Sequence, residues 1–247
     1  MEPIGRGSPP LTIQLFATCL VEAIRPAVGL AVIRVLQRLG IEVEHPQGQT
    51  CCGQPAFNAG ALEDARAMAR HTVDVLSRSE SEVVIPSGSC ADMVVHQYPA
   101  LLAGDPIYGP RAVRLAKRTR EFTQFLDLQA GPIASPCAAK LTYHPSCHLL
   151  RGLGVLEEPL RLLRQLSQCE VVPLPGAEEC CGFGGLFSVK MSAISGAMLK
   201  RKLDHIAGTG ADAVVACDLS CLLHMEGGLR RRGSKVAARH LAEVLAE

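Results

Sequence analysis

The chain has 247 residues, 48% of them apolar, which predicts a globular protein large enough to bury its own core. Lysine and arginine together number 25, against 24 acidic residues, so the strongly basic surface typical of nucleic-acid-binding proteins is excluded. No stretch approaches the roughly 18 uninterrupted apolar residues of a membrane-spanning helix, so we expect no transmembrane segment. Eleven cysteines in a chain with long helical patterns indicate metal or redox chemistry in a cytoplasmic protein rather than a secreted disulfide framework.

Short apolar runs alternate with helical periodicities along the whole chain. In the first half we expect strands at residues 11–16, 41–44 and 82–86, and helices at 27–39, closed by Gly40, and at 62–77. Residues 111–126 predict one long helix, and residues 129–136, with Gly131 and Pro132, predict a linker. In the second half the same patterns predict strands at 140–143, 170–172 and 213–216, and helices at 159–166 and 193–207.

Strands that alternate with helices imply parallel βαβ units joined by right-handed crossovers. We therefore predict an α/β fold made of two pseudo-symmetric, Rossmann-like halves, which either form separate sheets or share one. The predicted organisation is an N-terminal tail at residues 1–10, a first repeat at 11–135 and a second repeat at 136–247. In open parallel sheets, ligands bind beyond the carboxyl ends of the strands.

The cysteines repeat along the chain, which supports the two-fold division. Each half contains a Cys-Cys-Gly sequence, at Cys51-Cys52-Gly53 and at Cys180-Cys181-Gly182. Other cysteines keep nearly the same offset, between 128 and 131 residues, and all of them fall at predicted strand ends or in the loops that follow. The repeat thus predicts two equivalent sets of four cysteines, Cys19/Cys51/Cys52/Cys90 and Cys147/Cys180/Cys181/Cys221.

Thiolates are ligands of iron–sulfur clusters and of many zinc sites. Structural zinc sites favour Cys-x-x-Cys pairs, but Ser87 and Asp218 occupy the first position of that pattern before Cys90 and Cys221. Adjacent cysteines are also easier to share between two irons of one cluster than to place on one tetrahedral ion. The pattern therefore favours iron–sulfur clusters over zinc, and over a thiol–disulfide oxidoreductase, which would use Cys-x-x-Cys.

Several segments resemble the two copies of the cysteine-rich CCG domain. This domain occurs in heterodisulfide reductase, in iron–sulfur subunits of glycolate and glycerol-3-phosphate dehydrogenases, and in the lactate utilisation protein A family, which the chain resembles most. The segments that carry the likeness are Phe16-Ala17-Thr18-Cys19-Leu20, Cys51-Cys52-Gly53-Gln54-Pro55, Ser87-Gly88-Ser89-Cys90, His144-Pro145-Ser146-Cys147, Cys180-Cys181-Gly182-Phe183-Gly184-Gly185-Leu186-Phe187-Ser188-Val189-Lys190-Met191 and His240-Leu241-Ala242-Glu243-Val244-Leu245.

The resemblance implies an iron–sulfur subunit of a complex that oxidises L-lactate to pyruvate, together with a ferredoxin-like iron–sulfur protein and a third small subunit. It implies two clusters, of [4Fe–4S] type, held by the eight repeated cysteines. It also implies that the chain relays electrons rather than acting alone, and that any membrane association is peripheral and made through the partners.

The chain departs from heterodisulfide reductase, in which each copy carries five cysteines ending in Cys-x-x-Cys. Here Ser87 and Asp218 replace the fourth, which favours electron relay over disulfide cleavage. A heterodisulfide-reductase-like activity on a disulfide or thiol remains the alternative, as does an iron–sulfur subunit for another 2-hydroxy acid such as glycolate. Ser87 and Asp218 either bind iron through oxygen or hydrogen-bond the backbone, and Cys217 is a candidate fifth ligand. His144 and His148 are either donors to cluster sulfur, proton relays or plain loop residues.

Overall fold

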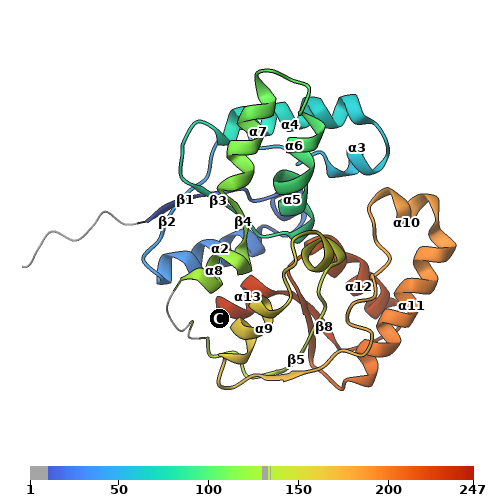
Figure 1. Ribbon diagram of the computed structural model, residues 1–247. Coiled ribbons are helices and arrows are strands. Elements are labelled where there is room, and N and C mark those ends of the chain that lie inside the picture. Colours follow the sequence, from blue (N-terminus) through green and yellow to red (C-terminus); the bar gives the residue numbers. More distant parts are fainter. Residues whose placement is uncertain (1–10, 130–132, 134) are drawn as a thin grey trace, which may run out of the picture.

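The computed structural model describes residues 11–129, 133 and 135–247, which form two α/β halves packed against each other (Figure 1). The first half contains a parallel sheet of order β2-β1-β3-β4, made of β1 (Thr12–Leu15), β2 (Glu42–Glu44), β3 (Glu82–Ile85) and β4 (Thr119–Glu121). The second half repeats it as β6-β5-β7-β8, made of β5 (Lys140–Tyr143), β6 (Glu170–Val172), β7 (Ala213–Ala216) and β8 (Ala237–His240). The predicted fold class is confirmed, with two separate sheets.

The two halves agree down to single hydrogen bonds. The residue after β1, Phe16, donates its backbone N–H to the carbonyl of Val84 on β3 at 3.0 Å. The residue after β5, His144, donates in the same way to Val215 on β7 at 2.8 Å. Phe16 and His144 therefore occupy equivalent backbone positions at the carboxyl ends of the first strands.

Helices cover both faces of each sheet. In the first half they are α1 (Cys19–Ile24), α2 (Pro26–Arg38), α3 (Gln54–Asn58), α4 (Leu62–Leu76), α5 (Gly88–Asp92), α6 (Tyr98–Leu101), α7 (Tyr108–Lys117) and α8 (Phe122–Leu128). In the second half they are α9 (Glu157–Arg164), α10 (Leu186–Lys190), α11 (Ser192–Gly208), α12 (Leu219–Arg231) and α13 (Leu241–Leu245). Two π-helical turns, η1 (Met93–Gln97) and η2 (His148–Gly152), complete the described elements. Across the described residues, no helix is both long and apolar enough to cross a membrane.

Successive side chains of a strand point to opposite faces of the sheet, so the apolar side chains are divided between two cores, one on each face. On β3, Val84 packs into an inner core, while Val83 and Ile85 pack into an outer core with α4 and α7. The inner core takes side chains from both halves, such as Leu36 of α2 and Leu245 of α13. Figure 1 shows α2 and α8 facing α9 and α13 between the two sheets, so the halves share one buried layer.

Outside residues 111–126, every predicted strand and helix is present within two residues of its predicted ends. Helix α2 shows why the prediction succeeded. Its apolar side chains are buried, and Gly40, just after its end, has a φ of 73°. Two backbone hydrogen bonds close this end of the helix. These run from Gly40 N–H to Gln37 and from Ile41 N–H to Leu36, as in a Schellman motif.

The single long helix predicted over residues 111–126 is wrong. Helix α7 ends at Lys117, strand β4 follows, and α8 begins after Glu121. Pairing with β3, where Val83 N–H donates to Arg118 at 2.7 Å, outweighs the helical periodicity of this segment. A capping box between Glu121 and Gln124 starts α8 and was the sequence signal of the break. Strand β8 was also not predicted. Residues 1–10 and most of the predicted linker, with Gly131 and Pro132, lie outside the described residues, so the boundary at 135 stays a prediction.

Glu121 is fully buried, and this burial gives a pH-dependent stability. Desolvation raises the pKa of its carboxyl to about 7, although Thr123 hydrogen-bonds one oxygen. Between the unfolded value near pH 4.5 and pH 7, the folded chain binds a proton that the unfolded chain releases. The free energy of unfolding should therefore fall as pH rises through this window, by roughly 3 kcal/mol in total.

The substitution Glu121→Gln keeps an oxygen for the Thr123 N–H and removes the charge. In urea unfolding at pH values across this window, the variant should lose most of the wild-type slope. Parallel slopes in the two proteins would contradict the assignment to Glu121.

Candidate functional site

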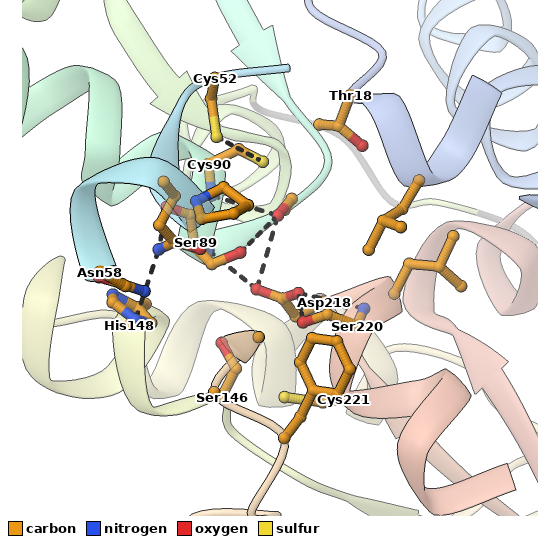
Figure 2. A pocket seen from close by; sticks show the side chains of 18 of the residues that line it. Thr18, Cys52, Asn58, Ser89, Cys90, Ser146, His148, Asp218, Ser220 and Cys221 are labelled. Atoms are coloured by element: carbon orange, nitrogen blue, oxygen red, sulfur yellow. Dashed lines mark hydrogen bonds between the residues drawn. The ribbon is translucent and has the colours of Figure 1, made fainter. Parts of the chain in front are cut away.

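All eight cysteines of the two predicted sets line one cavity of about 190 Å³ between the halves. Figure 2 shows Cys52, Cys90 and Cys221 among the residues around it. The segments that carry them, loops or the first turns of helices, follow β1, β2 and β3 in the first half and β5, β6 and β7 in the second. Because all these strands are parallel, their carboxyl ends meet at one edge of each sheet, and the two edges face the same space. Two sites predicted separately thus open onto a shared cavity.

Within the first set, each thiol interacts with the next one along the sequence. Cys19 contacts Cys51, Cys51 contacts Cys52, and Cys52 Sγ lies 3.4 Å from Cys90 Sγ. The structure therefore brings together four sulfurs that are as much as 71 residues apart in the sequence.

The second set repeats these contacts one by one. Cys147 contacts Cys180, Cys180 contacts Cys181, and Cys181 contacts Cys221. The repeat read from the sequence therefore corresponds to two copies of one arrangement of sulfurs.

The glycine of each Cys-Cys-Gly sequence is required by the local backbone. Gly53 and Gly182 have φ values of 85° and 93°, a region that side chains strongly disfavour. A Cβ on Gly182 would also lie 2.7 Å from the carbonyl oxygen of Ser195. The turn directs the Gly182 N–H at Cys180 Sγ, 3.3 Å away, so the backbone itself donates to a cysteine sulfur.

Buried hydroxyls fix the two Cys-Cys-Gly loops to their own halves. The Tyr98 hydroxyl donates to the carbonyl of Cys52 at 2.7 Å, and the Ser195 hydroxyl donates to the carbonyl of Gly182 at 2.8 Å. Both side chains are buried. The cysteines therefore project from loops whose backbone is held in one position, which suits a preformed binding site.

In each set, one cysteine ionises more easily than its neighbours because they donate hydrogen bonds to its sulfur. Hydrogen bonds from Cys19 and Cys52 lower the pKa of Cys51 to about 2, against the opposing effect of burial. Hydrogen bonds from Cys147 and Cys181 lower the pKa of Cys180 to about 2 in the same way. Thiolates are the form in which cysteine binds metal, so the first cysteine of each pair is ready to do so.

Ser87 and Asp218 meet across the two halves, with the Ser87 hydroxyl 3.5 Å from a carboxylate oxygen of Asp218. Each caps the helix that carries the last cysteine of its set, because Ser87 accepts from Cys90 N–H and Asp218 accepts from Ser220 N–H. The second oxygen of Asp218 also accepts from the backbone N–H of Ser89 at 2.8 Å. Both residues thus make hydrogen bonds and also line the cavity, and their contacts join the halves beside it.

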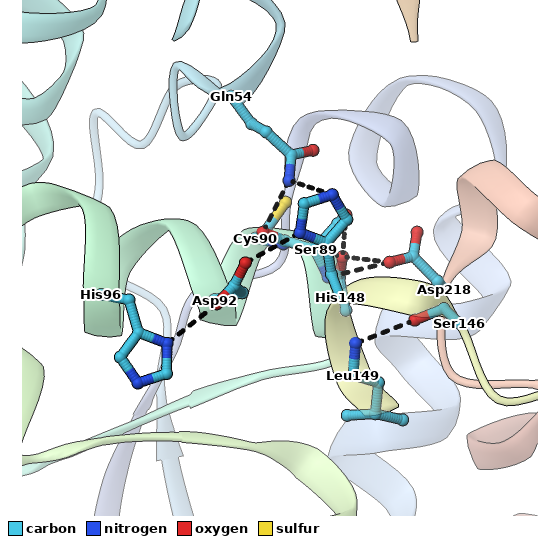
Figure 3. Close-up of polar contacts among 10 residues, drawn as sticks. Gln54, Ser89, Cys90, Asp92, His96, Ser146, His148, Leu149 and Asp218 are labelled. Carbon is cyan, nitrogen blue, oxygen red and sulfur yellow. Dashed lines mark hydrogen bonds and ion pairs between the residues drawn. The ribbon is translucent and has the colours of Figure 1, made fainter. Parts of the chain in front are cut away.

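A second polar contact joins the halves at Asp92, which accepts from His96 and from His148 at 2.8 Å each (Figure 3). Burial opposes ionisation of Asp92, but hydrogen bonds from His148 and His96 outweigh it and lower the pKa of the carboxyl. The other ring nitrogen of His148 lies 3.4 Å from Gln54 at the rim of the cavity. His148 thus links the loop after β5 to the first half.

The three remaining cysteines lie in the inner core or against it. Cys217, the candidate fifth ligand, is fully buried there with its sulfur 3.6 Å from the Tyr143 hydroxyl, and it is not among the described residues that line the cavity. Cys137 is buried in the same core, and the Cys169 thiol donates to the Cys137 carbonyl at 2.9 Å.

The sequence left three roles open for His144: a donor to cluster sulfur, a proton relay or a loop residue. One of its ring nitrogens and the sulfurs of Cys181 and Cys221 all lie within 4.8 Å of one another. The side chain is 0% exposed, and burial is the main cause that lowers the pKa of its imidazole to about 3. The structure therefore places a neutral imidazole against the second cysteine set. The signal in the sequence was its place just before Pro145-Ser146-Cys147.

The family of cysteine-rich CCG domains matches the chain at residues 13–94 and 141–226, one match in each half. Lactate utilization protein A 2 of Bacillus cereus is 43% identical over 239 residues, which are 96% of this chain and 98% of that protein. Lactate utilization protein A of Shouchella clausii is 45% identical over 237 residues, which are 95% of this chain and 98% of that protein. The chain belongs to the lactate utilization protein A family. The resemblance inferred from the sequence is confirmed.

Among solved structures, glutamate racemase RacE1 of Bacillus anthracis aligns with 96% of this chain and 79% of its own length, at 11% identity. Its TM-score of 0.38 is too low to support an argument about fold or function. The family membership therefore rests on the sequence matches and on the two CCG copies that the structure places around one cavity.

Proposed function

We propose that the chain holds two iron–sulfur clusters, one on each cysteine set, and relays electrons within a complex that oxidises L-lactate to pyruvate. The observation that carries this proposal is the convergence of two equivalent sets of four thiols on one cavity. The names of the relatives supply the process, lactate utilisation.

The donor set of this site fits iron–sulfur clusters. Its ligand atoms are soft thiolates presented by fixed loops, with backbone N–H groups directed at sulfur. Oxidation of lactate to pyruvate releases two electrons, and bound clusters would supply carriers that accept them one at a time. The cysteines that line the cavity would hold the clusters, and the burial of Cys52, Cys181 and Cys221 would limit the access of water to them.

The expected partners are a ferredoxin-like iron–sulfur protein and a third small subunit. The letter in the name of the relatives, protein A, fits a system of several proteins. In this assignment the isolated chain should hold clusters but should not oxidise lactate without its partners.

A redox reaction on a disulfide or thiol substrate, reducing the disulfide or oxidising the thiol, is the second candidate, and the shared cavity favours it. A small molecule that entered between the two cysteine sets would touch both of them, near Ser89, Ser146 and Ser220. The two candidates differ in whether the isolated chain turns over a disulfide when it is given an artificial electron donor.

The deciding experiment is anaerobic reconstitution of the full chain with iron and sulfide. We expect about eight iron atoms per chain, two [4Fe–4S] clusters' worth, and a paramagnetic signal on reduction. Adding the two partner proteins should then allow lactate, in preference to glycolate, to reduce the chain. Protein that retains only zinc, with no visible absorption, would contradict the proposal. Disulfide turnover by the chain alone would favour the second candidate.

A further inference from the structure

The two cysteine sets have the same sulfurs but different surroundings, and the difference begins at His144. In the part of the chain that the structure describes, His144 is the side chain with two buried polar atoms that lack a hydrogen-bond partner, its two ring nitrogens. A buried donor without a partner is costly, and such groups in native proteins are usually satisfied by something. The sulfurs of Cys181 and Cys221 in the second set lie within 4.8 Å of one of its ring nitrogens.

The equivalent position in the first half holds no donor. Phe16 makes the same backbone hydrogen bond after the first strand that His144 makes, and its ring packs in the outer core together with Cys52. The first set therefore meets an apolar ring where the second meets an imidazole.

At a second pair of equivalent positions, the second half again carries the stronger hydrogen-bond donor. The turn at Gly53 packs against Met68 of α4, and the turn at Gly182 packs against Met198 of α11. Met68 and Met198 therefore occupy equivalent positions in the two halves. One turn further along, α4 carries Thr72 and α11 carries Lys202, both buried. The Lys202 ammonium donates to the carbonyls of Gly176 at 2.6 Å and Ala177 at 3.2 Å, in the loop that leads to Cys180.

We propose that His144 donates an N–H to a cysteine sulfur of the second set once this set holds its cluster, and that His144 and Lys202 together make it the site of higher reduction potential. The inference rests on the proposed function, because it concerns the clusters that the sets would hold. It makes His144 and Lys202 positioning residues that bias the direction of electron flow toward the second set.

The physical reason is that reduction adds negative charge at the sulfurs. An N–H donor and a buried ammonium both stabilise that charge, and hydrogen bonds to sulfur and local charge are known to set cluster potentials. A neutral imidazole has one N–H, which suits donation to sulfur, while the other nitrogen remains a bare acceptor, the less costly of the two to leave unpaired. Direct ligation of iron through one nitrogen would instead leave the N–H itself without an acceptor among the described residues.

The test is a redox titration of the reconstituted full chain, followed by electron paramagnetic resonance. His144→Phe copies the residue of the first half and should lower one of the two midpoint potentials while the other stays in place. Lys202→Met, which keeps the apolar stem, should lower the same potential. His144→Gln retains an N–H donor and should keep this potential close to the wild-type value. Phe16→His should raise the potential of the cluster on the first set.

Iron content and circular dichroism are measured for every variant, because they separate a change of potential from a failure to fold. Unchanged potentials in His144→Phe at full iron content would overturn the inference and leave the proposed function intact. Loss of one cluster in folded His144→Phe, with strong nitrogen coupling to the wild-type signal, would overturn it by making His144 an iron ligand. Wild-type protein without clusters would overturn both the inference and the proposed function.

Discussion

Replacing Cys181 with alanine is expected to halve the bound iron, from about eight atoms per chain to about four, and to abolish lactate-dependent reduction. Cys181 is buried at the centre of the second set, in contact with both Cys180 and Cys221. Its loss leaves three thiols, and a relay that needs both sites loses its path. Iron and sulfide analysis of the reconstituted variant measures the first effect, and reduction by lactate with the partner proteins measures the second.

The chain offers a matched control for this change. Cys217 is also buried in the second half, only four residues before Cys221, but it lies in the inner core against Tyr143. Cys217→Ala should keep both clusters and lose only the stability that follows from a small cavity, about 1 kcal/mol. Cys52→Ala should remove the other cluster. Equal iron content in the wild type and in both ligand variants would refute the assignment of the two sets.

The sequence predicted the repeated α/β halves because short buried strands and amphipathic helices leave strong periodic signals. It also predicted that the cysteines of each set converge, since parallel strands bring their carboxyl ends together. The failure at residues 111–126 has the same origin, because strand β4 is short and its polar residues Thr119 and Arg120 interrupt no helical pattern. Only its pairing with β3 makes this segment a strand.

The shared cavity could not be predicted, because it depends on how the two sheets pack and not on either repeat. The contact between Asp218 and Ser89, 129 residues apart, is of this kind. The orphaned imidazole of His144 lies within one half, because its neighbours Cys181 and Cys221 come from the loop after β6 and from α12. The constant offset between cysteines in the sequence revealed that the halves are alike. That positions 16 and 144 are equivalent, and that their side chains differ, follows only from the matching backbone hydrogen bonds of the two halves.

The packing of the halves gives the second large effect, at Gly88. A Cβ at this position would lie 2.7 Å from Cβ of Leu149 and 3.1 Å from its Cα, atoms that cannot turn aside. Gly88 begins α5, which carries Cys90, and Leu149 lies in η2, directly after Cys147. Gly88→Ala should therefore push α5 away from η2, lower the free energy of unfolding by about 2–3 kcal/mol and weaken retention of both clusters.

The matched control is Gly196→Ala, because a Cβ at Gly196 meets no atom within 4 Å and the residue lies on the exposed side of α11. Alanine there should raise stability by up to about 1 kcal/mol and leave the iron content unchanged, since alanine favours a helix over glycine. Urea unfolding and the rate of iron loss to a chelator measure both variants. If the cavity needs the two halves in close contact, Gly88→Ala should release iron from both cysteine sets faster than the wild type does. Release from one set alone would mean that each half holds its cysteines in place independently of the other.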